Sequence, residues 1–288
     1  MTIGIVTKPG LADAGDTLLA LEHWLGSRRV SVVWSDAAAA LLPPAAERWV
    51  VSADDLPRAV DLVLVLGGDG TLLGMAGRIA AANVDIPLLG VNFGSLGFLT
   101  EITRPELFTS LETVIAGSAT HDERMLLRAR SLGAAMATHV ALNDIVFSRP
   151  SGARLLELGV WVGDQFVTTI RADGLIVASP TGSTAYNLSA GGPIVHPAMD
   201  ALVLTPIAPH TLSNRPIVIP AERDVRVQMM SRAAEDGMLV TFDGQITIDV
   251  PSGTDIVVGR APRPLRLIRA SARSYFDVLR EKLGWHQR

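Results

Sequence analysis

A buried strand, a glycine-rich turn and the start of a helix follow one another in Leu64-Val65-Leu66-Gly67-Gly68-Asp69-Gly70-Thr71-Leu72-Leu73. Glycine tolerates positive φ and lets a ligand approach the backbone closely. The helix that follows offers unpaired N–H groups and the positive end of its dipole, which together favour a phosphate. The stretch therefore indicates a phosphate-binding turn, and the alternative is an ordinary connection between a strand and a helix.

Asp69 is an unusual residue for an anion-binding turn, because its charge repels phosphate. It fits if it accepts a proton or organises a metal ion, whereas in an ordinary turn it would cap the helix. The turn is not a Walker A motif, and it matches the dinucleotide fingerprint poorly. No Gly-Lys-Ser/Thr follows, as a Walker A loop requires, and the third glycine, Gly74, comes one position late for a dinucleotide fingerprint.

The segments around this turn alternate between strand and helix. Apolar strands are expected at Thr2–Thr7, Val30–Trp34, Asp61–Leu66 and Pro87–Asn92, and helices at Leu18–Leu25, Thr71–Ala82 and Pro105–Ile115. Continuous apolar strands that alternate with helices indicate a parallel sheet covered on both faces. We therefore expect an α/β, Rossmann-like domain over residues 1–120. A second glycine-rich loop, Asn92–Leu99, follows the last of these strands and should lie near the first loop.

Short strands with turns between them dominate from about His121. The apolar run His139–Phe147 is expected to form one strand, and Val162–Gln165 and Phe242–Gln245 are typical of hairpin turns. Many short strands with few helices indicate a β-sandwich-like domain over residues 121–270. A last helix is expected at Ser274–Leu283, within a C-terminal segment of residues 271–288.

Composition excludes several kinds of protein. The 288 residues include no cysteine, which excludes disulfides, cysteine-ligated zinc and a cysteine nucleophile. The net charge of −4 argues against a nucleic-acid partner, and no apolar run is long enough to predict a membrane span. A cytoplasmic location is expected. Only Lys8 and Lys282 are lysines, so catalysis centred on lysine is not expected, although Lys8 follows the first strand and could meet a phosphate.

Ala172–Pro193 is the most unusual stretch, with five hydroxyl residues, four glycines and one tyrosine. Small residues open space for a planar ligand, while hydroxyl and backbone N–H groups supply hydrogen bonds without charge. The alternative is a structural loop of small polar residues. A serine hydrolase built on Ser183 with His196 or His210 is not favoured, because no Gly-x-Ser-x-Gly elbow is present.

Asn143 and Asp144 form a polar pair inside the apolar run Val140–Phe147. Adjacent residues of a strand point to opposite faces, so at most one of the two faces any given core. Polar pairs in such runs are usually hydrogen-bonded partners or ligand contacts.

Together these segments resemble the bacterial NAD kinase (ATP-NAD kinase) family. Gly67–Thr71 matches a signature that is shared with diacylglycerol kinases and phosphofructokinases. The more specific match is Asp173–Ile176 followed by Pro180–Tyr186 and Ser189–Pro193. The segments Asn92–Leu99, Pro209–Leu212, Arg215-Pro216 and Leu283–Trp285 also fit, and the resemblance covers nearly the whole chain in order.

The resemblance implies ATP-dependent phosphorylation of the adenosine 2′-hydroxyl of NAD, with Asp69 as the general base and a divalent metal, Mg²⁺, as cofactor. It also implies that the C-terminal segment returns to the first domain. No residue is assigned to the metal. Phosphate contacts are expected from Gly67, Gly68, Gly70 and Thr71. NAD contacts are expected from Asp69, Gly70, Asn143, Asp144, Arg154, Arg171, Asp173, Thr184, Ala185, Tyr186, Ser189 and Gln245.

Two residues qualify the resemblance. The family more often has Asn-Glu where this chain has Asn143-Asp144, so the carboxylate reaches one methylene less far. Arg171 matches a position where arginine accompanies a preference for NAD over NADH. The resemblance also implies a homodimer or homotetramer. The alternatives are another kinase with a Gly-Gly-Asp-Gly loop, acting on a lipid or a sugar, and a non-catalytic regulator that binds a dinucleotide.

Overall fold

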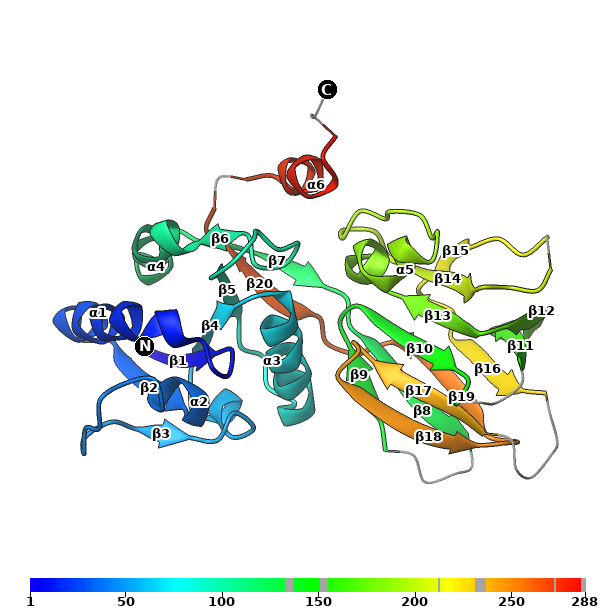
Figure 1. Ribbon diagram of the computed structural model, residues 1–288, viewed down its shortest axis with the longest axis horizontal. Coiled ribbons are helices and arrows are strands. Elements are labelled where there is room, and N and C mark those ends of the chain that lie inside the picture. The colour runs from blue at the N-terminus through cyan, green and yellow to red at the C-terminus, as the bar shows by residue number, and fades with distance from the viewer. Residues whose placement is uncertain (133–136, 151–154, 212, 231–236, 272, 286–288) are drawn as a thin grey trace. The chain divides into compact units, whose positions relative to one another are not determined.

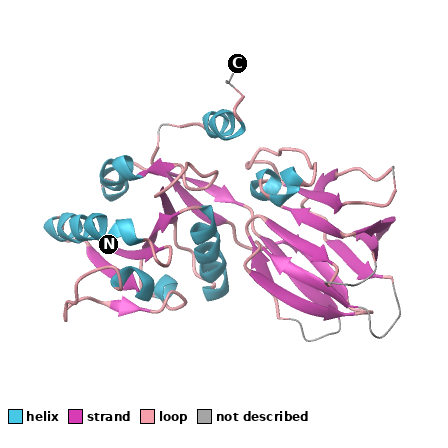
Figure 2. Ribbon diagram, in the orientation of Figure 1, coloured by secondary structure: helices cyan, strands magenta, loops and turns pink. Residues whose placement is uncertain are grey.

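The computed structural model describes residues 1–132, 137–150, 155–211, 213–230, 237–271 and 273–285 (Figure 1). The chain divides into two units. The first comprises Met1–Glu123 and Leu265–Arg288, and the second comprises Arg124–Pro264. Helices gather in the first unit, whereas the second is built mainly of strands (Figure 2).

The first unit is built on a sheet in the order β3-β2-β1-β4-β5-β20-β7, with β6 beside β5. Its strands are β1 (Thr2–Thr7), β2 (Ser31–Ser35), β3 (Val50–Val51), β4 (Leu62–Gly67), β5 (Leu88–Asn92), β6 (Ile102–Thr103), β7 (Thr120–Arg124) and β20 (Leu265–Arg269). The pairs from β3 through β5 are parallel, as are those of β5 with β6 and with β20. Every residue of β4 and β5 is buried, which confirms the predicted parallel sheet with both faces covered.

Helices cover this sheet because their apolar residues recur every three or four positions. In α1 (Gly15–Ser27), Leu18, Leu21 and Leu25 are fully buried and pack in one core with β1 and β4. The remaining helices and 3₁₀ turns of this unit are η1 (Ala12–Ala14), α2 (Asp36–Ala39), η2 (Leu56–Arg58), α3 (Asp69–Ala82), η3 (Arg104–Glu106), α4 (Leu107–Ile115) and α6 (Tyr275–Leu283). Within the described part of the chain, no helix combines the length and the apolar character that a membrane crossing needs.

The second unit contains two six-stranded antiparallel sheets, in the orders β15-β14-β13-β10-β17-β18 and β12-β11-β16-β19-β8-β9. Their strands are β8 (Leu127–Leu132), β9 (His139–Ala141), β10 (Asp144–Ser148), β11 (Leu156–Val162), β12 (Gln165–Ala172), β13 (Gly174–Ala178), β14 (Ala201–Ile207), β15 (Ile217–Pro220), β16 (Val225–Met229), β17 (Gly237–Phe242), β18 (Ile246–Pro251) and β19 (Asp255–Arg260). Alternate residues of both sheets, such as Phe147 and Leu158, form one apolar core. The predicted sandwich-like fold is confirmed.

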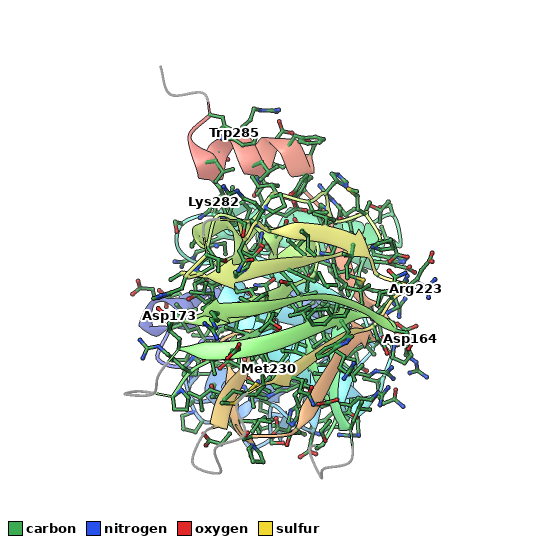
Figure 3. All side chains as sticks on the ribbon, turned by 90° about the vertical axis from the view of Figure 1, so that its right-hand side faces the viewer. Asp164, Asp173, Arg223, Met230, Lys282 and Trp285 are labelled. Carbon is green, nitrogen blue, oxygen red and sulfur yellow. The ribbon has the colours of Figure 1, made fainter. Side chains whose placement is uncertain are left out.

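Both predicted hairpin turns are present. Gly163, with φ of +57°, lies in the turn between β11 and β12, and its N–H donates to the Asp224 carbonyl at 2.8 Å. Figure 3 shows Asp164 and Arg223 at this edge of the unit. The turn between β17 and β18 places Asp243 and Gly244 at positive φ, the conformation that a tight hairpin turn requires.

The prediction of one strand over His139–Phe147 is wrong. The run is two strands in different sheets, because β9 pairs with β8 whereas β10 pairs with β13 and β17. The chain passes from one sheet to the other at Leu142 and Asn143. Leu142 at this corner is 1% exposed and continues the apolar pattern, so the polar pair Asn143-Asp144 was the one local sign of the break.

The C-terminal segment joins the first unit earlier than residue 271. Leu265–Arg269 forms β20, which pairs with β5 of the first sheet. Ion pairs accompany this return, from Arg266 to Asp85 at 2.8 Å and from Arg269 to Asp122 at 3.2 Å. β20 is as apolar as the sandwich strands before it, which explains why sequence pattern assigned it to them. Helix α6, which follows, belongs to the same unit.

Leu158→Ala should destabilise the second unit by about 2–5 kcal/mol, because it removes a fully buried side chain and leaves a cavity. Val167→Ala on the partner strand is the matched control, since Val167 is 39% exposed and should change stability by about 0.5 kcal/mol or less. Urea unfolding of both variants measures the difference. Equal losses would contradict the assignment of Leu158 to the core.

Candidate functional site

A cavity of about 920 Å³ lies in the second unit. Its floor is the outer face of the sheet that contains β10, where Asp144, Val146 and Ser148 point to the same side because they alternate along the strand. Thr241 of β17 lies opposite Val146 and continues this floor. The other lining residues are Asn143, Arg149, Pro150, Asp173, Ala185, Tyr186, Ile207, Asp243 and Gly244.

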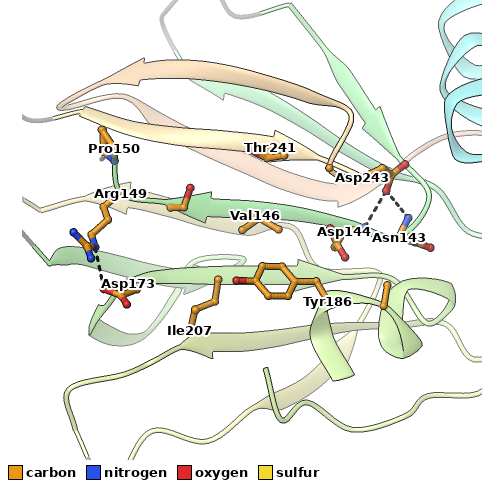
Figure 4. A pocket seen from close by; sticks show the side chains of 13 residues that line it. Asn143, Asp144, Val146, Arg149, Pro150, Asp173, Tyr186, Ile207, Thr241 and Asp243 are labelled. Carbon is orange, nitrogen blue, oxygen red and sulfur yellow. Dashed lines mark hydrogen bonds and ion pairs between the residues drawn. The ribbon is translucent and has the colours of Figure 1, made fainter. Parts of the chain in front are cut away.

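The stretch of small and hydroxyl residues supplies one wall of the cavity. It folds as η4 (Thr181–Thr184) and the short helix α5 (Tyr186–Ser189). Ser183 fixes this segment, since its hydroxyl donates to the Pro180 carbonyl at 2.6 Å and accepts from the Val195 N–H at 2.9 Å. Tyr186 is 46% exposed, and its ring lies along the cavity (Figure 4). The segment thus holds an accessible aromatic face over the sheet.

One end of the cavity is acidic. Asp144 is 4% exposed, and the neighbouring Asp243 carboxylate lies at the same end (Figure 4). Burial raises the pKa of Asp144 to about 7, and the charge of Asp243 adds to the shift. Burial also raises the pKa of Asp243, although three backbone N–H groups that donate to it act in the opposite direction. Asp144 therefore changes its protonation state close to neutral pH.

The opposite end carries an ion pair. The Arg149 guanidinium donates to Asp173 Oδ1 at 3.0 Å, and both side chains are partly exposed. Figure 4 shows this pair and the acidic end on opposite sides of Val146. A ligand along the floor would thus meet carboxyl groups at one end and a paired cation at the other.

In the first unit, Asp69 begins α3 but does not cap it. The N-cap residue is Gly68, without a side-chain hydrogen bond. The Asp69 carboxylate instead accepts from the loop that follows β5: Oδ2 accepts from the Phe98 N–H at 2.8 Å, and Oδ1 from the Leu99 and Thr100 N–H groups at 3.1 and 2.9 Å. The Thr100 hydroxyl donates to Oδ1 at 2.8 Å. The two glycine-rich loops are therefore joined, as their positions after neighbouring strands led us to expect.

This junction leaves no room for a side chain at Gly97, because a Cβ there would collide with the Asp69 carboxylate. Thr100 is fully buried, and its hydroxyl accepts from the Asn92 side-chain amide at 2.9 Å. The same Asn92 accepts from the Gly94 N–H at 2.6 Å. The Asp69 carboxylate thus sits in a continuous hydrogen-bond network that fixes its position.

Five of the predicted NAD contacts line this cavity: Asn143, Asp144, Asp173, Ala185 and Tyr186. Three others are not among its lining residues. Thr184 and Ser189 belong to the neighbouring wall segment, and Gln245 is exposed beyond the hairpin turn.

Arg171, on β12, forms an ion pair with Glu157 at 3.2 Å and is not a lining residue of the cavity either. Arg154 lies outside the described residues. Asp69, Gly70 and the other residues of the turn Gly67–Thr71 belong to the first unit.

Family models for ATP-NAD kinases match both parts of the chain, the N-terminal domain over residues 3–119 and the C-terminal domain over residues 142–270. The chain belongs to the ATP-NAD kinase family. The NAD kinase of Magnetococcus marinus is 43% identical over 289 residues, covering 99% of this chain and 93% of the relative. That of Geotalea daltonii is 46% identical over 238 residues, 82% of each chain.

Solved structures of this family are similar along the whole chain. A yeast NADH kinase complexed with NADH has a TM-score of 0.87 at 27% identity, covering 100% of this chain and 89% of the other. An NAD kinase from Archaeoglobus fulgidus in complex with ATP has a TM-score of 0.77 at 25% identity, covering 99% and 98%. The chain is thus a phosphotransferase, and NAD kinase is the function that these relatives support over a lipid or sugar kinase or a regulator.

The structure of this ATP-NAD kinase adds site residues that sequence reasoning missed. Arg149 and Asp243 carry charge into the cavity, and Val146, Ser148 and Thr241 form its floor. Given the bounds of β10, the alternation of the strand predicts that Val146 and Ser148 lie on the face opposite the core residues. The approach of Asp243 to a corner about 100 residues earlier had no local signal.

A preformed metal cage is not found among the residues that the structure describes. Across the described ranges, no three histidine or acidic side chains lie together in a way that could hold an ion. Mg²⁺ often binds through one or two carboxylates and the phosphates of its nucleotide.

Asp144→Asn should stabilise the protein at pH 8 and change it less at pH 5. The raised pKa means that a neutral Asp144 stabilises the folded chain below its ordinary pKa of 3.8, and that this contribution is lost as the pH rises to about 7. At about 1.4 kcal/mol per pKa unit, full ionisation costs on the order of 4 kcal/mol, which asparagine avoids. Thermal unfolding at both pH values measures the gap, with exposed Asp249→Asn as control. A gap that does not change with pH would contradict the assigned pKa.

Proposed function

We propose that this enzyme transfers the γ-phosphoryl group of ATP to the adenosine 2′-hydroxyl of NAD, giving ADP and NADP, with Asp69 as the general base. One observation carries the NAD-binding part of this proposal. Asn143, Asp144, Asp173, Ala185 and Tyr186, all expected to contact NAD, line one cavity in the second unit. At about 920 Å³ the cavity is of the size that cofactor sites have.

The cavity suits a nucleotide for chemical reasons. The exposed Tyr186 ring offers a face on which a base can stack. Asn143 can donate and accept hydrogen bonds, and Asp144 and Asp173 can accept them from amino or ribose hydroxyl groups. The yeast relative was solved with NADH bound, which supports a pyridine dinucleotide as the ligand.

Asp69 can accept the ribose proton on one oxygen. Oδ1 accepts three of the four hydrogen bonds described above, and Oδ2 accepts one, from the Phe98 N–H. A carboxylate oxygen can accept about two hydrogen bonds, so Oδ2 has room for the substrate hydroxyl. Although a carboxylate is a weak base, one held in position can take the proton as the phosphoryl bond forms.

The phosphate groups of ATP are proposed to lie at the turn Gly67–Thr71, where α3 begins. Backbone N–H groups and the helix dipole stabilise negative charge at the beginning of this helix. The Archaeoglobus relative was solved with ATP, which supports this donor. A bound divalent ion, Mg²⁺ in our proposal, would neutralise phosphate charge.

The turnover assay tests the function directly. Purified protein with NAD, ATP and Mg²⁺ should form NADP, and failure with both NAD and NADH would overturn the proposal. Asp69→Asn should lower kcat by about 10²–10⁴-fold, because the amide cannot take the proton. Asp16→Asn, an exposed first-turn aspartate of α1, is the matched control. Near-normal kcat in Asp69→Asn would remove Asp69 from the role of base.

Lys8→Ala should raise the KM for ATP about tenfold and leave the KM for NAD unchanged. The Lys8 N–H donates to the Leu66 carbonyl at 3.1 Å, which places this exposed residue beside Gly67 and the phosphate turn. Lys8→Arg keeps the charge and should lose less. Steady-state kinetics with each substrate varied in turn give the result, and an unchanged KM for ATP would exclude a phosphate contact.

The remaining expectations belong to this proposal as well. We propose a cytoplasmic enzyme, which the absence of cysteine supports, and a homodimer or homotetramer, which the family resemblance supports. Light scattering of the purified protein gives the oligomeric state.

A further inference from the structure

The corner between β9 and β10 is held by a side chain distant in sequence. The N–H groups of Leu142, Asn143 and Asp144 all donate to the Asp243 carboxylate, at 2.8, 2.7 and 3.1 Å. Oδ1 accepts two of these bonds and Oδ2 accepts one. Because three consecutive N–H groups converge on one carboxylate, the backbone of the corner has little freedom to turn.

The carbonyl side of the same corner is fixed as well. The Ser179 hydroxyl donates to the Leu142 carbonyl, and the Ser179 N–H donates to the Asn143 carbonyl at 2.9 Å. Gly182 packs so closely on Asn143 that a Cβ there would collide with its carbonyl oxygen. Asp243 thus binds the N–H groups of the corner, and Ser179 binds its carbonyl groups. The two polar side chains of the corner, Asn143 and Asp144, line the cavity.

The turn that carries Asp243 does not itself require an aspartate. Asp243 and Gly244 have φ of +50° and +64°, and the Gln245 N–H closes the turn on the Phe242 carbonyl at 2.8 Å. Asparagine adopts positive φ at least as readily and is common in such turns. A carboxylate, however, has two acceptor oxygens and no donor, so it can accept all three N–H groups, whereas an amide nitrogen would face one of them.

The position also has an electrostatic cost. Asp243 places a second carboxylate beside the buried Asp144, and its charge contributes to the raised pKa of that residue. A like charge next to a buried carboxyl group destabilises the fold. The cost is explained if the corner must be held in one shape for its side chains to meet a ligand.

The geometry points to Asp243 as a positioning residue for NAD: its carboxylate holds the Leu142–Asp144 backbone so that Asn143 and Asp144 face the dinucleotide. It acts through the backbone of its neighbours rather than on the reacting atoms. This inference rests on the proposed NAD kinase function. It is separate from the role of Asp69, which belongs to the phosphoryl transfer.

Asp243→Asn tests the inference without straining the turn. The KM for NAD and the calorimetric Kd for NAD should each rise about tenfold, because one or two hydrogen bonds to the corner are lost. The KM for ATP should stay within about twofold, since the phosphate turn is untouched. Asp249→Asn, an exposed aspartate on β18, is the matched control and should match the wild type.

The kinetics distinguish a role of Asp243 in positioning Asn143 and Asp144 from a role in the stability of the whole fold. A purely structural role would lower kcat in proportion to the folded fraction and leave both KM values and the NAD Kd unchanged, which would overturn the inference. So would unaltered kinetics. If the wild-type protein itself makes no NADP, the proposed function fails instead, and the two failures are distinguished by that one measurement.

A second variant covers the case in which Asp243→Asn does not fold. Ser179→Ala removes the hydroxyl that donates to the Leu142 carbonyl and leaves the Asp243 turn intact. It should raise the KM for NAD in the same direction, with the KM for ATP unchanged. An unchanged KM for NAD in a folded Ser179→Ala protein would show that the shape of the corner does not control NAD binding.

Discussion

In both units, an irregular segment beside the candidate site is held in shape by backbone N–H groups that converge on one carboxylate. Asp69 collects three N–H groups and a hydroxyl from the loop after β5, and Asp243 collects three N–H groups from the corner before β10. Charge-assisted bonds of this kind are roughly twice as strong as neutral ones. Each carboxylate therefore fixes the backbone of a segment that has no regular strand pairing to hold it.

The two carboxylates differ in what they leave available. Asp69 keeps an oxygen with unused capacity at the beginning of a helix, where negative charge is stabilised, and so suits a chemical role. Asp243 accepts hydrogen bonds from three successive residues, and the side chains of two of them, Asn143 and Asp144, line the cavity. The same arrangement, a carboxylate that collects backbone N–H groups, thus supports the proposed base in the first unit and the proposed NAD contacts in the second.

Sequence pattern was sufficient where burial is regular. The parallel strands and the core helices of the first unit follow from apolar periodicity, because β4 and β5 are covered on both faces. The glycine and hydroxyl segment could be identified from composition alone, and Tyr186 does line the cavity. The pattern failed at the corner of Leu142 and Asn143, where the polar pair was read as an interruption within one strand, and at β20, whose apolar residues do not reveal which sheet they enter.

Residues that act through long-range backbone contacts were beyond sequence reasoning. Asp243 was read as part of a hairpin turn, which it is, but its partners lie about 100 residues earlier in the chain. Thr100 likewise gave no signal, although its buried hydroxyl links Asn92 to Asp69. Such contacts depend on the folded topology, and a single sequence holds no local record of them.

The return of the chain at β20 makes the second unit an insertion within the first. Arg124–Pro264 is a continuous segment with its own core. The first sheet, in contrast, combines strands that precede this segment with β20, which follows it. During synthesis the ribosome therefore releases the whole sandwich before it releases β20. The sandwich can close while the sheet that carries Asp69 still lacks a strand, so the first unit is the last part of the protein to be completed.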